Sequence, residues 1–102
     1  MGDNGNAKTT VEVEQIKDEE IAPILKKVAN NKGIGALTQE IEKGAPLSAS
    51  KLQRYLQIGF QSASIILDYL VQIGALSKPD NETRIRSYIN KKLVVDTLNN
   101  NK

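Results

Sequence analysis

The stretch KLQRYLQIGFQSASIILDYLVQIGAL, residues 51–76, decides the fold of this 102-residue chain. It contains two helix-like runs separated by a turn at Gly59, and Gly74 follows the second run. The turn should need a positive φ angle, which Gly59 can adopt because it has no Cβ atom. In the second run, apolar residues have the i, i+3, i+4, i+7 spacing of a helix that buries one face: Ala63, Ile66, Leu67 and Leu70.

The residues before this stretch predict further helices. Residues 18–30 carry an apolar stripe of helical spacing, and Asp18 is expected to be the N-cap. Residues 34–43 can form a second short helix with Leu37 and Ile41 facing inward, although the pattern alone leaves this open. The helix at the start of the quoted stretch is expected to be capped by one of two serines, Ser48 or Ser50.

After Gly74 the hydrophobic pattern changes period. Residues 83–89, TRIRSYI, alternate as a strand does, and the turn KPDNE precedes them. Together they predict a two-stranded hairpin, a wing, near residues 75–89. Residues 90–98 are compatible with a last short helix or with a further strand. In the predicted hairpin, one face holds Ile85, with Ser87 and Ile89, and a basic outer face holds Arg84, Arg86 and Tyr88.

This order of elements predicts a winged helix-turn-helix, a fold that is mainly α with a small β-hairpin. The domain is expected to span residues 18–98. Residues 1–17 precede it as a disordered or extended arm, and residues 99–102 follow as a frayed tail. In such a fold the helix near residues 60–73 is the recognition helix, which lies in the major groove of DNA.

The segment SASKLQRYLQIGFQSASIILDYLVQIGAL resembles the DNA-reading gamma domain of the FtsK/SpoIIIE translocases. The resemblance covers about 30 of the 102 residues and implies a winged-helix module without the motor, since the chain has no phosphate-binding loop. The matching positions are Ser48, Ser50, Leu52, Gln53, Arg54, Ile58, Gly59, Phe60, Ala63, Leu67 and Gly74.

The start of the recognition helix departs from that family. Where the family has asparagine and arginines, this chain has Gln61, Ser62 and Ile65. The resemblance therefore implies a free-standing winged-helix module and indicates function less strongly than fold. It does not carry over the DNA sequence that the family reads.

Composition narrows the function classes independently. The chain has no cysteine and no histidine, so we expect no disulfide framework, no metal site, no cofactor and no enzyme activity. It has no apolar run long enough to span a bilayer and no visible signal peptide, which predicts a cytoplasmic protein, nucleoid-associated if it binds DNA. Residues 1–50 carry a net charge of −2 and residues 51–102 a net charge of +4, which favours a polyanion as partner.

The leading hypothesis is a small duplex-DNA-binding protein, acting as a homodimer: a transcription regulator, a partition or centromere binder, or a replication accessory factor. Polar residues at the start of the recognition helix would contact bases, and basic residues on the preceding helix and the wing would contact phosphates. The candidate DNA-binding residues are Lys51, Arg54, Gln61, Ser62, Ser64, Ile65, Lys78, Arg84 and Arg86.

A protein–protein interaction module is the alternative, because the recognition helix lacks Arg and Lys. Ile65 and Tyr69 would then be the contact residues. Steep weakening of binding with added salt would distinguish a DNA binder from this alternative.

Overall fold

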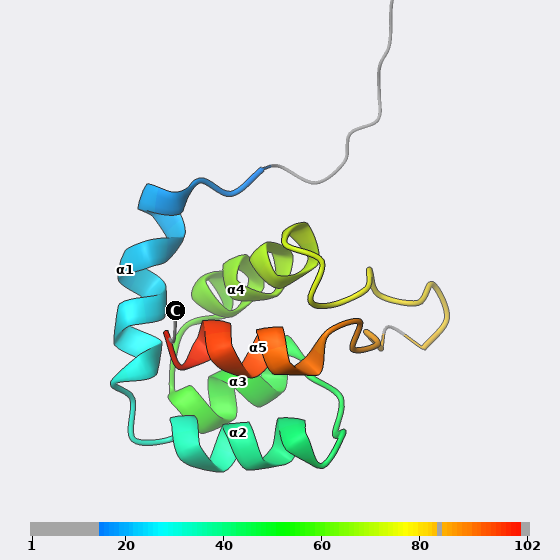
Figure 1. The fold of residues 1–102 in the computed structure, drawn as a ribbon, viewed down its shortest axis with the longest axis horizontal. Coiled ribbons are helices and arrows are strands. Elements are labelled where there is room, and N and C mark those ends of the chain that lie inside the picture. The colour runs from blue at the N-terminus through cyan, green and yellow to red at the C-terminus, as the bar shows by residue number, and fades with distance from the viewer. Residues whose placement is uncertain (1–14, 84, 101–102) are drawn as a thin grey trace, which may run out of the picture.

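The computed structural model describes residues 15–83 and 85–100, and these form a mainly helical body. α1 runs along one side, and the other helices stack beside it (Figure 1). The prediction of a mainly α fold is confirmed, and the segments left open at 34–43 and 90–98 contain helices. The helices are α1 (Asp18–Ala29), α2 (Ile34–Glu42), α3 (Ala49–Leu56), α4 (Phe60–Gln72) and α5 (Lys91–Leu98).

One hydrophobic core joins the five helices. α4 packs against α1 and α3, while α2 packs against α3 and α5. The predicted stripe of α4, from Ala63 to Leu70, is buried, and so are Leu37 and Ile41 of α2. Helical spacing of apolar residues therefore identified the inward faces of both helices correctly.

Capping residues mark the beginning or the end of several of these helices. The Ser48 hydroxyl accepts a hydrogen bond from the Lys51 amide at 3.1 Å, which confirms one of the two predicted caps of α3. Gly74 follows α4 with a φ angle of +82°, as expected of a C-terminal glycine. α1 differs from the prediction, because Lys17 is its N-cap and Asp18 is its first helical residue.

The turn between α3 and α4 consists of residues 57–59. The predicted turn between Leu56 and Phe60 is confirmed and Gly59 lies in it, but the positive φ angle of the turn is not at Gly59. Gln57 adopts the left-handed conformation instead, with φ of 54°, and Gly59 is the extended N-cap of α4 with φ of −72°. The left-handed residue is therefore the C-cap of α3 and not the glycine before α4.

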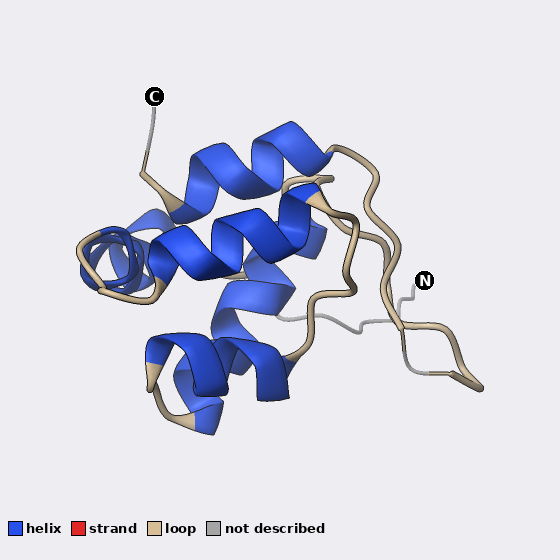
Figure 2. Cartoon of the chain, turned by 90° about the horizontal axis from the view of Figure 1, so that it is seen from below, coloured by secondary structure: helices blue, strands red, loops and turns tan. Residues whose placement is uncertain are grey.

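Residues 75–90, here called the 75–90 loop, project from the helical body between α4 and α5 (Figures 1 and 2). The described residues of this loop form no strand, and one isolated antiparallel bridge joins Leu76 to Tyr88. The Ser77 amide donates to the Ser87 carbonyl at 2.9 Å, but the Ser87 amide donates to the Ser77 hydroxyl. A side chain thus replaces a backbone acceptor, and the regular ladder of the predicted hairpin does not continue.

Side chains of the loop alternate between two faces as predicted, but the face expected to point outward is the one turned toward the helical body. Ile85 and Ile89 are 49% and 65% exposed, whereas the Arg86 side chain is 15% exposed and Tyr88 packs against the core. The predicted basic outer face is therefore wrong for Arg86 and Tyr88, because each finds a polar partner on the helical body. Arg84 lies outside the described residues.

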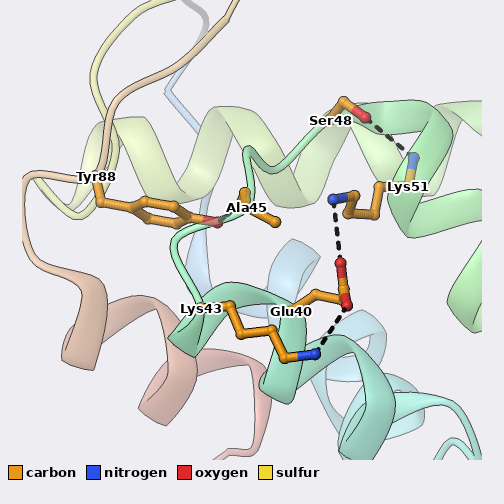
Figure 3. Close-up of polar contacts among 6 residues, drawn as sticks. All are labelled: Glu40, Lys43, Ala45, Ser48, Lys51 and Tyr88. Carbon is orange, nitrogen blue, oxygen red and sulfur yellow. Dashed lines mark hydrogen bonds and ion pairs between the residues drawn. The ribbon is translucent and has the colours of Figure 1, made fainter.

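Tyr88 fastens the base of the loop to the connection between α2 and α3. Its hydroxyl donates to the backbone oxygen of Ala45 (Figure 3). Partial burial raises the pKa of this hydroxyl above the ordinary tyrosine value of 10.0. Because the folded-state pKa is the higher one, the stabilisation by the neutral hydroxyl is complete below about pH 10 and is lost as the pH rises further.

We expect Tyr88→Phe to lower the free energy of unfolding by about 1 kcal/mol at neutral pH, since the Ala45 carbonyl loses its donor. Urea unfolding followed by circular dichroism measures the change, with Tyr69→Phe as the control on α4. The difference between parent and Tyr88→Phe should shrink above about pH 10. Equal effects of the two substitutions would contradict a specific role for this hydrogen bond.

The chain already packs on the core just before α1 begins, at Ile16. Ile16 is buried, and its amide and carbonyl both bond to the side-chain amide of Gln72 on α4, at 2.7 and 2.8 Å. The greater part of the predicted arm, residues 1–14, lies outside the described residues. At the other end, the Asn99 side chain donates to the Thr38 hydroxyl at 3.1 Å and so connects the end of α5 to α2.

Candidate nucleic-acid interface

The outward face of α4 lies opposite its buried stripe. Gln61, Ile65, Asp68 and Gln72 recur along it with helical spacing. Gln61 is exposed near the N-terminal end, and the other three are half-buried. At the C-terminal end of this face, the Gln72 side chain is engaged by the backbone of Ile16.

The exposed start of α4 includes an apolar side chain. Phe60, the first residue of α4, is 65% exposed, whereas Ile58 in the preceding turn is half-buried against the core. The first helical residues, Phe60 and Gln61, therefore present a ring and an amide side by side to solvent.

The three other candidates on α4 are less accessible than predicted. Ser62 lies on the flank that faces α1, where it lines a shallow groove of about 110 Å³ with Pro23 and Ile24. Ser62 therefore lies beside the buried stripe, between the inward and outward faces of α4. Ser64 is half-buried, and Ile65 packs partly against the core.

The two cations of α3 have different surroundings. Lys51 Nζ lies 3.8 Å from Glu40 Oε1 of α2, and its side chain is 16% exposed. Glu40 also lies 3.8 Å from Lys43 Nζ, so one carboxylate sits between two ammonium groups (Figure 3). Arg54 is exposed, with its guanidinium carbon 5.8 Å from the centre of the Tyr55 ring. Arg54 is consequently the more available cation of the pair.

The candidate residues of the 75–90 loop also differ in exposure. Lys78 is exposed, and Arg84 lies outside the described residues. Arg86 Nη2 lies 3.9 Å from Asp68 Oδ1 on the outward face of α4, and Arg86 Nε is buried without an acceptor in the described part of the chain. The structure thus brings Arg86 and α4 together and ties Lys51 to α2.

Asp68 is not among the residues to which the sequence pattern assigned a role. The opposite charges of Asp68 and Arg86 are visible in the sequence. Their contact depends on the path of the loop back to the helix, which no local pattern encodes. Gln72 was missed for the same reason, since its partner Ile16 is 56 residues away.

The loop tip is ordered by Asp80. Its carboxylate accepts hydrogen bonds from the amides of Glu82 and Thr83, at 2.8 and 3.0 Å. The Thr83 amide, followed by that of Glu82, lowers the pKa of this carboxyl from its ordinary value. Asp80 is therefore engaged as a turn-forming residue, close to the exposed Lys78.

Residues 15–83 and 85–100 contain no group of three or more acidic, histidine or cysteine side chains placed to hold a metal ion. None of the helices in the described part of the chain is both long and apolar enough to cross a membrane.

The chain matches no protein-family profile, and comparisons with curated proteins and with solved structures also give no match. The resemblance to the gamma domain of the FtsK/SpoIIIE translocases therefore stays a prediction that rests on the residues quoted above.

Proposed function

We propose that this protein binds duplex DNA through α3 and α4, with the start of α4 in the major groove. One observation carries the proposal: a three-residue turn joins two packed helices, and the second begins with an exposed glutamine, Gln61. In helix-turn-helix proteins, the N-terminal residues of the second helix are those that contact base edges.

Gln61 suits base contact chemically. Its amide has a donor and an acceptor and can bond bidentately to adenine in the major groove. Ser64 and Ile65 follow one turn later and are the next candidates, Ile65 through contact with a thymine methyl group. Ser62, on the α1 flank, is better placed for a phosphate than for a base.

Arg54 and Lys78 are the described candidates best suited to phosphate contact. Both are exposed, and neither forms an ion pair with a carboxylate of residues 15–83 or 85–100. Phosphate contacts of this kind give affinity that depends on salt and little on sequence. Lys51 is held by Glu40 and contributes less in this proposal.

The resemblance supports a winged-helix module in which the 75–90 loop acts as the wing. Transcription regulation, partition or centromere binding, and replication support all remain roles that such a module can serve. Homodimer formation is part of the proposal, because a two-fold protein contacts two half-sites about 34–36 Å apart.

The decisive experiment is titration of fluorescent random duplex DNA with the full chain at two salt concentrations. DNA binding through phosphates predicts that log K falls linearly with log salt, with a slope of about −0.9 per contacted phosphate. Sequence selection then identifies a cognate site. No binding at low salt would refute the proposal.

With a cognate site in hand, we expect Gln61→Ala to reduce the preference for cognate over scrambled duplex by about 1–3 kcal/mol. Binding to the scrambled duplex should change little, because Gln61 carries no charge. Gln39→Ala, an exposed glutamine of α2, is the matched control. Anisotropy titrations at one fixed salt concentration measure the affinities of all three proteins for both duplexes. Equal preference in Gln61→Ala and parent would exclude Gln61 as a base reader.

A protein partner is the second candidate function, and the exposed Phe60 favours it. Ile65 and Tyr69, the contact residues first expected for such a partner, are half-buried against the core, so the contact would pass to Phe60. Binding through an aromatic side chain is weakly dependent on salt, which separates this function from DNA binding.

A further inference from the structure

We propose that Asp68 of α4 is a positioning residue, which holds the 75–90 loop against the outward face of α4 through Arg86. The inference rests on the proposed function. The contact between Asp68 and Arg86 matters for DNA binding because it keeps Lys78 at a fixed place relative to the start of α4. It assigns to Arg86 the role of an anchor and not that of a phosphate ligand.

The burial of Arg86 supports this assignment. Its side chain is 15% exposed, and its Nε atom is enclosed by the protein. A guanidinium that contacts DNA phosphates needs its donors at the surface. Arg86 instead directs its Nη2 atom toward Asp68, whose side chain is 50% exposed at the edge of the same contact.

The position of Arg86 within the loop makes it an effective anchor. It lies between Ile85 and Ser87, whose carbonyls accept hydrogen bonds from the amides of Asp80 and Ser77, at 3.0 and 2.9 Å. Both arms of the loop are therefore joined on either side of Arg86. Fixing this one side chain on α4 fixes the direction of the two arms together, and Lys78 lies on one of them.

The two possible roles of Arg86, anchor or phosphate ligand, predict opposite changes in DNA affinity when the charge of Asp68 is removed. Removing a negative charge from a DNA-facing helix strengthens binding if electrostatics alone decides. If Arg86 is a phosphate ligand, removing the Asp68 charge also frees its guanidinium to contact DNA. If Asp68 positions the loop, its removal weakens binding although the surface becomes more positive.

The first measurement is the DNA affinity of Asp68→Asn in the full chain, with Glu42→Gln on α2 as the control that removes the same charge. We expect Asp68→Asn to weaken binding about threefold, in line with the modest strength of half-exposed ion pairs, and Glu42→Gln to leave it unchanged or stronger. Stronger binding by Asp68→Asn would overturn the proposal and make Arg86 a phosphate ligand restrained by Asp68.

The second measurement needs no DNA, so it separates failure of this inference from failure of the proposed function. The chain has no cysteine, which allows spin labels on cysteines introduced at Glu82 in the loop and Gln39 on α2. Electron paramagnetic resonance should give a narrow distance distribution in the parent and in Glu42→Gln, and a broader one in Asp68→Asn. Equal distributions in all three would refute the positioning role even if the parent binds DNA.

Discussion

Gly33→Ala is expected to lower the free energy of unfolding by about 3 kcal/mol, the upper part of the usual range for overpacking. A Cβ atom at this position would lie 1.8 Å from the backbone oxygen of Tyr55 and 2.8 Å from its carbonyl carbon. These are backbone atoms of α3, so no side-chain rotation can relieve the clash. The φ angle of Gly33 is −82°, so the cost comes from the close approach and not from backbone strain.

Gly35→Ala is the matched control, two residues further along the chain. Nothing lies within 4 Å of a Cβ atom built there, and Gly35 is inside α2. Because alanine is the better helix former, we expect this substitution to stabilise the protein by about 0.5 kcal/mol. Urea unfolding monitored at 222 nm measures both, and effects of the same sign would contradict the packing of Gly33 against α3.

Ile66→Ala is expected to lower the free energy of unfolding by about 3–4 kcal/mol, because it removes buried methyl groups and leaves a cavity at the centre of the core. Ile66 is fully buried, with 0% exposure, and comes from the helix that packs against both α1 and α3. A domain of this size has a total stability of roughly 5–10 kcal/mol, so the variant should be largely unfolded in mild denaturant.

Ile65→Ala removes the same atoms from the neighbouring position. Ile65 is half-buried, so the expected loss is less than about 1.5 kcal/mol. Thermal and urea unfolding of the two variants should therefore differ by about 2 kcal/mol or more. Similar losses would mean that the inward and outward faces of α4 are not those described.

α1, α3 and α4 could be predicted because each one buries a stripe of apolar residues with helical spacing, whereas the shorter apolar patterns of α2 and α5 left their structure open. The stripe from Ala63 to Leu70 on α4 is the clearest case, and its burial is nearly complete. The Ser48 cap and the glycine after α4 were predictable as well, because both are set by backbone groups within one turn of the residue.

The features that could not be predicted all depend on what lies against a segment. Alternation at Ile85 to Tyr88 shows which residues share a face, but the face turned to the body is decided by Asp68 and the Ala45 carbonyl. Ser62 is polar, yet the packing of α1 along that flank of α4 half-buries it. The exposure of a candidate residue is therefore a tertiary property. Sequence spacing alone predicted the exposure of Gln61 correctly but not that of Ser62.

The end of α3 is held by a residue outside the α3–α4 pair. The side-chain amide of Asn31 donates to the Leu56 carbonyl at 2.7 Å across 25 residues, and the same side chain accepts from the Gly33 amide at 2.8 Å. The α3–α4 pair is thus not a self-sufficient unit. Residues 49–72 grafted alone onto another scaffold would lose the Asn31 donor that holds the Leu56 carbonyl.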